Sequence, residues 1–185
     1  ADTIDVATNA IVFGDRGQVE YRNEEGKVVT RLGSLEISKT DKNADNLNKA
    51  DYTTPTSKAE SNYFQTDGVV RDAYTIRSMS DNVGGNDIIK THGDKNVAIG
   101  GAGEDLIHLE GNNNVALGDN GLVEYESTVV DANNNKIKHV YGDSHKTYLH
   151  HIETTSDTMG GKDEITTGNG NNVVMGGTAS DKIAT

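Results

Sequence analysis

The sequence of 185 residues contains no cysteine, no tryptophan, one proline and two phenylalanines. The lack of cysteine excludes disulfide bonds and thiolate metal sites, so an extracellular form would need another staple, such as bound metal ions. Hydrophobic residues make up only 33% of the chain, which is too little for a thick globular core. No apolar run could span a bilayer, and no signal peptide precedes the pattern that starts at Ala1. We therefore read the chain as a fragment of a longer protein.

Positive charge is also scarce, and the formal net charge is −12. This balance excludes nucleic acid as a partner, because binding phosphates requires a positive face. It suits cation binding or plain solubility. The composition alone would also allow disorder, but short aliphatic segments recur at a fixed spacing, which indicates a folded repeat.

Polar residues recur every nine positions in two stretches of the chain. They are Asp87, Asn96, Asp105 and Asn114 in the first stretch, and Asp163, Asn172 and Asp181 in the second. Aliphatic or mixed triplets such as VAI, VAL and VVM follow them. A short fixed period is typical of a solenoid, in which each nine-residue half-coil is a short strand followed by a tight turn.

The alternation of Asp and Asn predicts two different sides. Parallel coils stack about 4.8 Å apart, so aligned carboxylates would repel one another unless a cation lay between them. Ca²⁺ fits best, because it accepts six to eight oxygens at variable angles. We expect ions on the Asp side and hydrogen-bonded Asn on the other. In the turn Gly118–Val123, Val123 replaces the Asp, so we expect the column to end there, with Asp119 still able to contribute. Ala179 replaces a pattern Gly before Asp181, which weakens the case for an ion in that turn.

The stretch Gly100–His108, GGAGEDLIH, matches the nonapeptide G-G-x-G-x-D-x-U-x at every specified position, with Ile107 as the large apolar residue. The chain therefore resembles the RTX (hemolysin-type) family of calcium-binding parallel β-rolls, found in secreted toxins, proteases and very large bacterial surface proteins. The resemblance implies secretion in an unfolded form and folding outside the cell at millimolar Ca²⁺. The residues expected to hold Ca²⁺ are Gly85, Asn86, Asp87, Gly100, Gly101, Ala102, Gly103, Asp105, Asp119, Gly121, Gly161, Asp163, Gly176 and Asp181.

The predicted fold is all-β, a parallel β-roll or β-solenoid interrupted by two β-hairpin-like inserts. The similar stretches Phe13–Tyr21 and Leu117–Tyr125 lead into these inserts and indicate a tandem array. The predicted segments are a partial roll unit at 1–21, an insert of strands and a polar loop at 22–77, a roll unit at 78–125, a hairpin insert at 126–153 and a roll unit at 154–185.

The inserts hold three weaker signals. His139, His145 and one of the pair His150 and His151 would suit a transition metal, but we favour polar strand residues on a solvent face. The GDSH stretch at 142–145 has no later Asp-x-x-His to supply a base, so no catalytic residue is expected. The aromatic residues Tyr52, Tyr63, Phe64, Tyr141 and Tyr148 would equally suit sugar stacking or ordinary packing.

We expect a non-enzymatic, calcium-stabilised segment of a large secreted or cell-surface bacterial protein, with a structural, filament-forming or adhesive role. Its expected partners are calcium ions, further copies joined end to end, and a carbohydrate or cell-surface ligand. One alternative is the C-terminal secretion and folding module of an enzyme such as a protease or lipase, although such modules tend to be uninterrupted. The other is a carbohydrate- or ice-binding adhesin module that uses the inserts.

Overall fold

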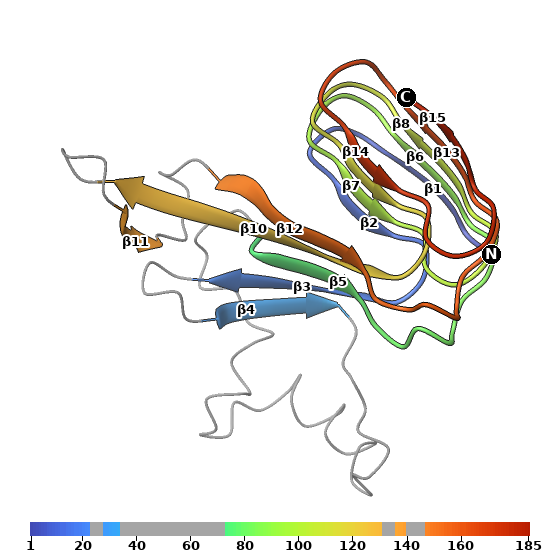
Figure 1. Cartoon of the computed structure of the whole chain (residues 1–185), viewed down its shortest axis with the longest axis horizontal. Coiled ribbons are helices and arrows are strands. Elements are labelled where there is room, and N and C mark those ends of the chain that lie inside the picture. The colour runs from blue at the N-terminus through green and yellow to red at the C-terminus, as the bar shows by residue number, and fades with distance from the viewer. Residues whose placement is uncertain (23–27, 34–72, 131–135, 140–146) are drawn as a thin grey trace, which may run out of the picture. The chain divides into compact units, whose positions relative to one another are not determined.

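A computed structural model of the chain describes residues 1–22, 28–33, 73–130, 136–139 and 147–185 (Figure 1). These residues form strands and turns, without a helix, which confirms the all-β class. None of them forms an apolar helix long enough to cross a membrane. The chain divides into two compact units. We call Ala1–Gly17, Arg77–Leu122 and Ile152–Thr185 the two-sheet unit, and Gln18–Ile76 and Val123–His151 the six-strand unit.

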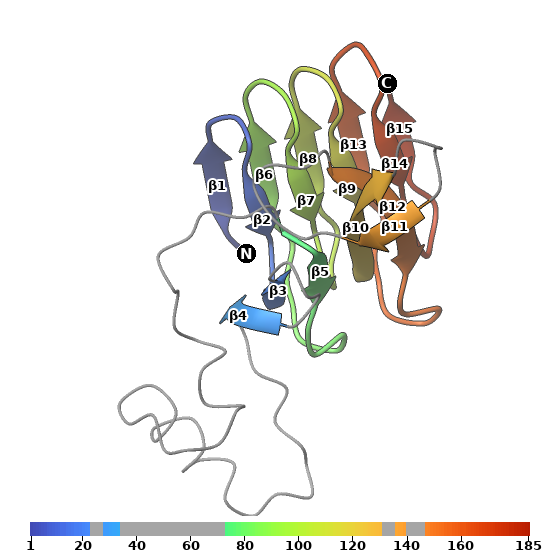
Figure 2. The same ribbon diagram turned by 90° about the vertical axis from the view of Figure 1, so that its left-hand side faces the viewer.

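The two-sheet unit contains two sheets of parallel strands, and the chain alternates between them (Figure 2). One sheet has the order β1 (Thr3–Val6), β6 (Ile88–Thr91), β8 (Leu106–Leu109), β13 (Glu164–Thr167) and β15 (Lys182–Ala184). The other has the order β14 (Val173–Met175), β9 (Val115–Leu117), β7 (Val97–Ile99) and β2 (Ile11–Phe13). Each aliphatic triplet thus forms a strand, and each intervening polar segment forms the turn to the opposite sheet.

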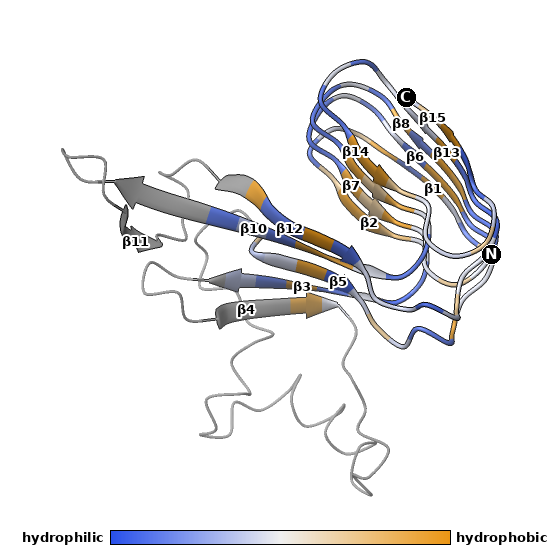
Figure 3. Cartoon of the chain, viewed as in Figure 1, coloured by the Kyte–Doolittle hydropathy of each residue, from blue (hydrophilic) through white to orange (hydrophobic). Residues whose placement is uncertain are grey.

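The core is a thin layer between these sheets. Along β6, β8 and β13 the side chains alternate between exposed and buried positions, as the pleat of a strand requires. The inward positions align as a column of isoleucines, Ile4, Ile89, Ile107, Ile165 and Ile183. The three central members are fully buried and pack with Val12, Ala98 and Ala116 of the opposite sheet. Figure 3 shows the apolar character of β2, β7 and β14 against their more polar turns.

The six-strand unit combines strands from both inserts in one sheet. The order is β11 (Lys136–His139), β10 (Gly121–Val130), β5 (Thr75–Ser78), β3 (Gly17–Arg22) and β4 (Val28–Gly33), and β12 (Thr147–Thr154) also pairs with β10. β3 pairs antiparallel with β4, and β10 with β11. In the expected hairpin insert at 126–153, β10 and β11 pair antiparallel, and β12 pairs with β10 as well.

Each insert leaves and re-enters the two-sheet unit at one place. The N–H group of Met79 donates to the carbonyl of Arg16 over 2.8 Å, and that of Thr155 donates to the carbonyl of Asn120 over 3.0 Å. The coils resume without a gap after the second insert, since β13 pairs directly with β8. The expectation that the Asp column ends at Val123 is therefore wrong. Val123 lies buried in β10, and Asp163 takes the next position in the column.

The isoleucine column predicts a graded response to truncation. Ile107→Ala should lower the free energy of unfolding by about 2–5 kcal/mol, because the side chain is completely buried and its loss leaves a cavity. Ile183→Ala should cost about 1 kcal/mol or less, since that side chain is 46% exposed. Urea denaturation of both variants in one buffer would measure the difference, and equal losses would contradict this account of the core.

Candidate metal site

The aspartates at the start of the five-stranded sheet form a ladder. Each backbone N–H group donates to Oδ1 of the aspartate one coil further on. The distances are 2.5 Å from Asp2 to Asp87, 2.7 Å from Asp87 to Asp105, 2.8 Å from Asp105 to Asp163 and 3.0 Å from Asp163 to Asp181. Asp2 was missed in the sequence, because the first insert separates it by 85 residues from its neighbour in the ladder.

The second carboxylate oxygens of this ladder are buried without a partner. Oδ2 of Asp87, Asp105 and Asp163 has no hydrogen-bond donor within reach. Turn carbonyls converge on the same place, since a Cβ atom added to Gly14 would lie 2.5 Å from the Gly100 oxygen and 2.6 Å from Asp87 Oδ2. Gly100 and Gly118 occupy equivalent positions beside Oδ2 of Asp105 and Asp163, respectively. A side chain at Gly14, Gly100 or Gly118 would fill the space beside Oδ2, so glycine is required there. At each of these three positions, a carbonyl oxygen and an aspartate Oδ2 lie next to that space.

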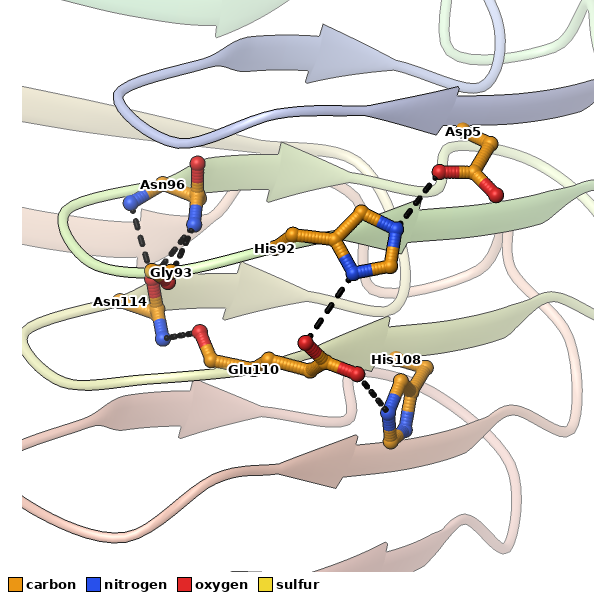
Figure 4. Close-up of polar contacts among 7 residues, drawn as sticks. All are labelled: Asp5, His92, Gly93, Asn96, His108, Glu110 and Asn114. Carbon is orange, nitrogen blue, oxygen red and sulfur yellow. Dashed lines mark hydrogen bonds and ion pairs between the residues drawn. The ribbon is translucent and has the colours of Figure 1, made fainter.

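The opposite turns contain a matching ladder that is complete. Asn114 Oδ1 accepts the N–H group of Asn96 over 2.9 Å, and Asn172 Oδ1 accepts that of Asn114 over 2.9 Å. The amide nitrogens donate to turn carbonyls, from Asn96 to Gly93 and from Asn114 to Glu110 (Figure 4). The expected hydrogen-bonded Asn side is confirmed. The amide NH₂ group supplies the donor that the aspartates on the other side lack.

The electrostatics of the Asp ladder are unfavourable without a counter-charge. The pKa of Asp105 is raised to about 7, mainly by burial and also by the charges of Asp87, Asp15 and Asp119, against the hydrogen bond from the Asp87 backbone that lowers it. The pKa of Asp163 is likewise raised to about 7, mainly by burial and also by the charges of Asp119, Asp105 and Asp181, against the hydrogen bond from the Asp105 backbone. The ladder therefore requires protons or a cation near neutral pH.

Asp15 and Asp119 stabilise the turns where the inserts leave. Asp15 accepts the N–H groups of Gly85 and Ala102 over 3.2 and 2.8 Å. Asp119 accepts the N–H group of Gly161 over 2.9 Å, and both the N–H group and the hydroxyl of Thr178. Burial also raises the pKa of Asp15. Each carboxylate thus joins the point at which the chain returns from the insert to the turn of the next coil. Its place after a strand-ending glycine, as in GDRG and GDNG, could have indicated this role.

Most of the remaining predicted ligands lie in the stacked turns, and one, Gly121, lies in a strand. Gly85, Gly103 and Gly161 stack directly over one another, so that a Cβ atom on Gly103 would lie 2.6 Å from the Gly85 oxygen. Asn86 Oδ1 accepts the Glu104 N–H group over 3.1 Å. Gly101 packs against Asp15, and Gly176 faces Oδ2 of Asp181. Gly121 does not belong to these turns, because it is the first residue of β10. Its N–H group donates to Ser78 Oγ over 2.9 Å.

Ala179 was the residue that departed from the glycine pattern. It adopts φ +73°, so the turn before Asp181 keeps a left-handed backbone in spite of the Cβ atom. The ladder bond from Asp163 to Asp181 is present at 3.0 Å. The substitution therefore leaves the turn geometry in place at a local conformational cost.

A histidine bridges two carboxylates on the exposed surface of the coils (Figure 4). His92 Nε2 lies 2.8 Å from Asp5 Oδ1, and His92 Nδ1 lies 3.0 Å from Glu110 Oε2. His108 Nε2 lies 3.8 Å from Glu110 Oε1. The Glu110 and Asp5 contacts raise the pKa of His92, and the His92 contact lowers that of Glu110. The 18-residue separation of His92 and Glu110, one full coil, was the overlooked signal.

Most of the histidine, GDSH and aromatic candidates in the inserts lie outside the residues that the structure describes. His150 Nδ1 lies 3.0 Å from Glu126 Oε2, and His139 lies in β11. His145, the GDSH stretch, Tyr52, Tyr63, Phe64 and Tyr141 lie outside the described residues, and Tyr148 lies in β12.

Among the described residues, no three His, Asp or Glu side chains come together as a metal-binding group. The oxygens that do converge combine one carboxylate per turn with backbone carbonyls, the mixed donor set that Ca²⁺ accepts. None of the protein-family models, curated proteins or solved structures compared with the chain matches it.

The raised pKa values predict a pH dependence in the absence of metal. The folded chain binds more protons than the unfolded chain between the ordinary aspartate pKa of 3.8 and about 7, so stability falls as the pH rises through this window. In EDTA, the Tm should be roughly 5 °C lower at pH 8 than at pH 5.5. Asp105→Asn keeps the ladder acceptor and removes the charge, so it should flatten this dependence, whereas the exposed Asp157→Asn should not. A Tm that rises across the window would contradict the burial of unpaired charge.

The contacts of His92 with Asp5 and Glu110 predict a small contribution to stability that is lost as the pH rises above the pKa of this histidine. The pKa of His92 is raised in the folded state, so its contribution is fully present below the unfolded-state value of 6.5 and is lost as the pH rises through the folded-state value. His92→Gln should lower the Tm at pH 6 and leave it unchanged at pH 9. Thermal melts at both pH values would measure this, and 1 M salt should reduce the pH 6 effect by screening. An effect equal at both pH values would argue against the charged bridge.

Proposed function

We propose that the two-sheet unit is a calcium-stabilised parallel β-roll, and that the chain is a structural segment of a large secreted or cell-surface bacterial repeat protein. The observation that carries this proposal is the Asp ladder with its unpartnered Oδ2 atoms. Parallel strands joined at an 18-residue register, and an insert that leaves the register intact, further support a roll.

The residues that would hold Ca²⁺ are the aspartates of the ladder, together with carbonyls of the turns that converge on them. Asp87, Asp105 and Asp163 each offer a buried Oδ2, and the carbonyls of Gly100, Gly118 and Gly176 lie at the same places. A bound ion supplies positive charge that offsets these carboxylates and accepts oxygens from two adjacent coils. The backbone N–H groups bind Oδ1 of these aspartates, which leaves Oδ2 of Asp87, Asp105 and Asp163 without a hydrogen-bond donor.

The Asn ladder explains why the ion would act as a folding signal. A chain with Asn on both sides would form complete ladders without any ion, whereas this chain keeps one side incomplete. Buried carboxylates without a partner oppose folding, because their desolvation is not offset. Folding would then be favoured where Ca²⁺ is abundant, as it is outside the cell, and disfavoured where it is scarce.

This role needs no catalytic group and no reaction. A rod-like stack of coils that folds on release would serve as an extender, a filament component or part of an adhesive surface protein. The two inserts would supply the binding surface, and a carbohydrate or cell-surface ligand is the partner that the adhesive form of this proposal requires.

Calcium should therefore raise the Tm strongly. Each site contributes about 2.7 kcal/mol when Ca²⁺ is at one hundred times its Kd, which corresponds to roughly 5–10 °C in a chain of this size. Circular dichroism melts in EDTA, in Ca²⁺ and in Mg²⁺ at equal ionic strength would measure the shift. The calcium-induced shift should decrease in Asp105→Asn and persist in Asp157→Asn. Identical melts in EDTA and Ca²⁺ would rule out a structural ion.

A further inference from the structure

Both inserts leave the coils on the side of the Asp ladder. The connections on the Asn side are direct, since β1 leads to β2, β6 to β7, β8 to β9 and β13 to β14 without an excursion. The inserts instead interrupt the passages from β2 to β6 and from β9 to β13, which end at Asp87 and Asp163, respectively. Among the described coils, the turns to which the inserts return are therefore turns of the Asp ladder.

The carboxylates at the insert ends lie close to the ladder. Gly160, from the returning chain, and Gly177, from the next coil, both pack against the Asp119 carboxylate, which is completely buried. The charges of Asp15 and Asp119 both raise the pKa of Asp105. Like charges thus gather around the insert ends, and they repel one another unless a counter-ion lies among them.

The Asn turns contain no such accumulation of buried charge. The N–H groups of Asn96 and Asn114 donate to amide oxygens of the next coil, and their NH₂ groups donate to turn carbonyls (Figure 4). A carboxylate adds a further bond, since Asp94 Oδ1 accepts the N–H group of Asn112 over 2.7 Å, but Asp94 is exposed and its charge stays hydrated. The turns on this side can therefore keep their hydrogen bonds without a cation.

The two ladders are closely matched apart from their charge. Asp87, Asp105, Asn96 and Asn114 are each exposed by 3% or less. The ladder bond is 2.7 Å from Asp87 to Asp105 and 2.9 Å from Asn96 to Asn114, and both bonds join residues 18 positions apart. A difference in stability between the two sides would therefore follow from the buried charge and the unpartnered Oδ2 atoms of the aspartates.

We propose that the two-sheet unit opens from one side when the cation is lost: the Asp turns separate and release the ends of both inserts, while the Asn turns keep their hydrogen bonds. Opening lets water reach the ladder carboxylates, which removes the cost of their burial. Such local opening requires less free energy than unfolding of the whole unit.

The cation then controls how firmly the ends of each insert are held, so that binding by the inserts would depend on it. That this cation is Ca²⁺ rests on the proposed function. The one-sided opening itself rests on the buried, unpartnered carboxylate oxygens of one ladder and the complete hydrogen bonding of the other.

Amide hydrogen exchange of the whole chain, resolved by NMR, tests this proposal at matched positions. In Ca²⁺, the N–H groups of Asp87, Asp105, Asn96 and Asn114 should all be protected from exchange. In EDTA at pH 8, the two aspartate amides should lose at least about tenfold more protection than the two asparagine amides, because only the Asp turns open.

The amides at the end of the second insert should respond together with the ladder. Gly161 and Thr178 both donate to the Asp119 carboxylate, so their N–H groups should lose protection in EDTA. Asn112 is the matched control, because its N–H group also donates to a carboxylate, that of Asp94, but lies in an Asn turn. Its protection should be retained.

Reciprocal variants exchange the chemistry of the two ladders. Asp105→Asn removes the charge and supplies an NH₂ group, so it should restore most of the protection of the Asp87 amide in EDTA. Asn114→Asp makes the opposite change and should lower the protection of the Asn96 amide by about tenfold. The exposed Asp157→Asn should leave the exchange pattern unaltered. Far-ultraviolet circular dichroism would show that each variant keeps its strands.

Equal protection of the two sides in EDTA, or loss of all protection, would overturn one-sided opening; if Ca²⁺ also raises the Tm, the calcium-stabilised roll stays in place. An Asp105→Asn variant that leaves the Asp87 amide as unprotected in EDTA as in the unaltered chain would overturn it as well. If Ca²⁺ changes neither the Tm nor the exchange, but the Asp turns are still less protected than the Asn turns, one-sided opening is supported and the calcium-stabilised roll is refuted.

Discussion

The hydrogen bond from a backbone N–H group to a side-chain oxygen in the next coil is the interaction on which this structure depends. It occurs in the Asp turns and in the Asn turns, and within an uninterrupted stretch it joins residues 18 positions apart. Such a bond fixes the height of each coil and the face that each strand turns inward. The thin aliphatic core can then be regular with few hydrophobic residues, since a slip by one residue would expose the isoleucine column.

Aspartate and asparagine perform the same task in these two ladders with different consequences. The amide satisfies a neighbouring carbonyl, whereas the second carboxylate oxygen remains unpartnered among carbonyl oxygens. The chain therefore contains its own comparison between a self-sufficient turn and one that depends on a cation or a proton. The difference is a single NH₂ group per turn, repeated along one side of the stack.

The nine-residue period and the aliphatic triplets were sufficient to predict the strands, their class and the Asp87, Asp105, Asp163 and Asp181 column. What the period could not reveal was continuity across an insert, because Asp2 and Asp87 are neighbours in space but far apart in sequence. For the same reason, the sequence led to the wrong conclusion that the column stops at Val123. The shared sheet of the inserts also escaped notice, since alternating strand patterns do not specify which strand from a distant segment will pair with them.

The two inserts leave the coils at the turns that contain Asp15 and Asp119, and this has a consequence for how the sequence of such chains can change. Each carboxylate closes the turns around the exit point, and a backbone hydrogen bond from Thr155 to the Asn120 carbonyl joins the two ends of the second insert. Because these bonds hold the exit points closed, the insert between them can change in length and composition while the stack stays in register. These positions are natural grafting points, at which new recognition surfaces can be acquired or exchanged without redesign of the two supporting sheets.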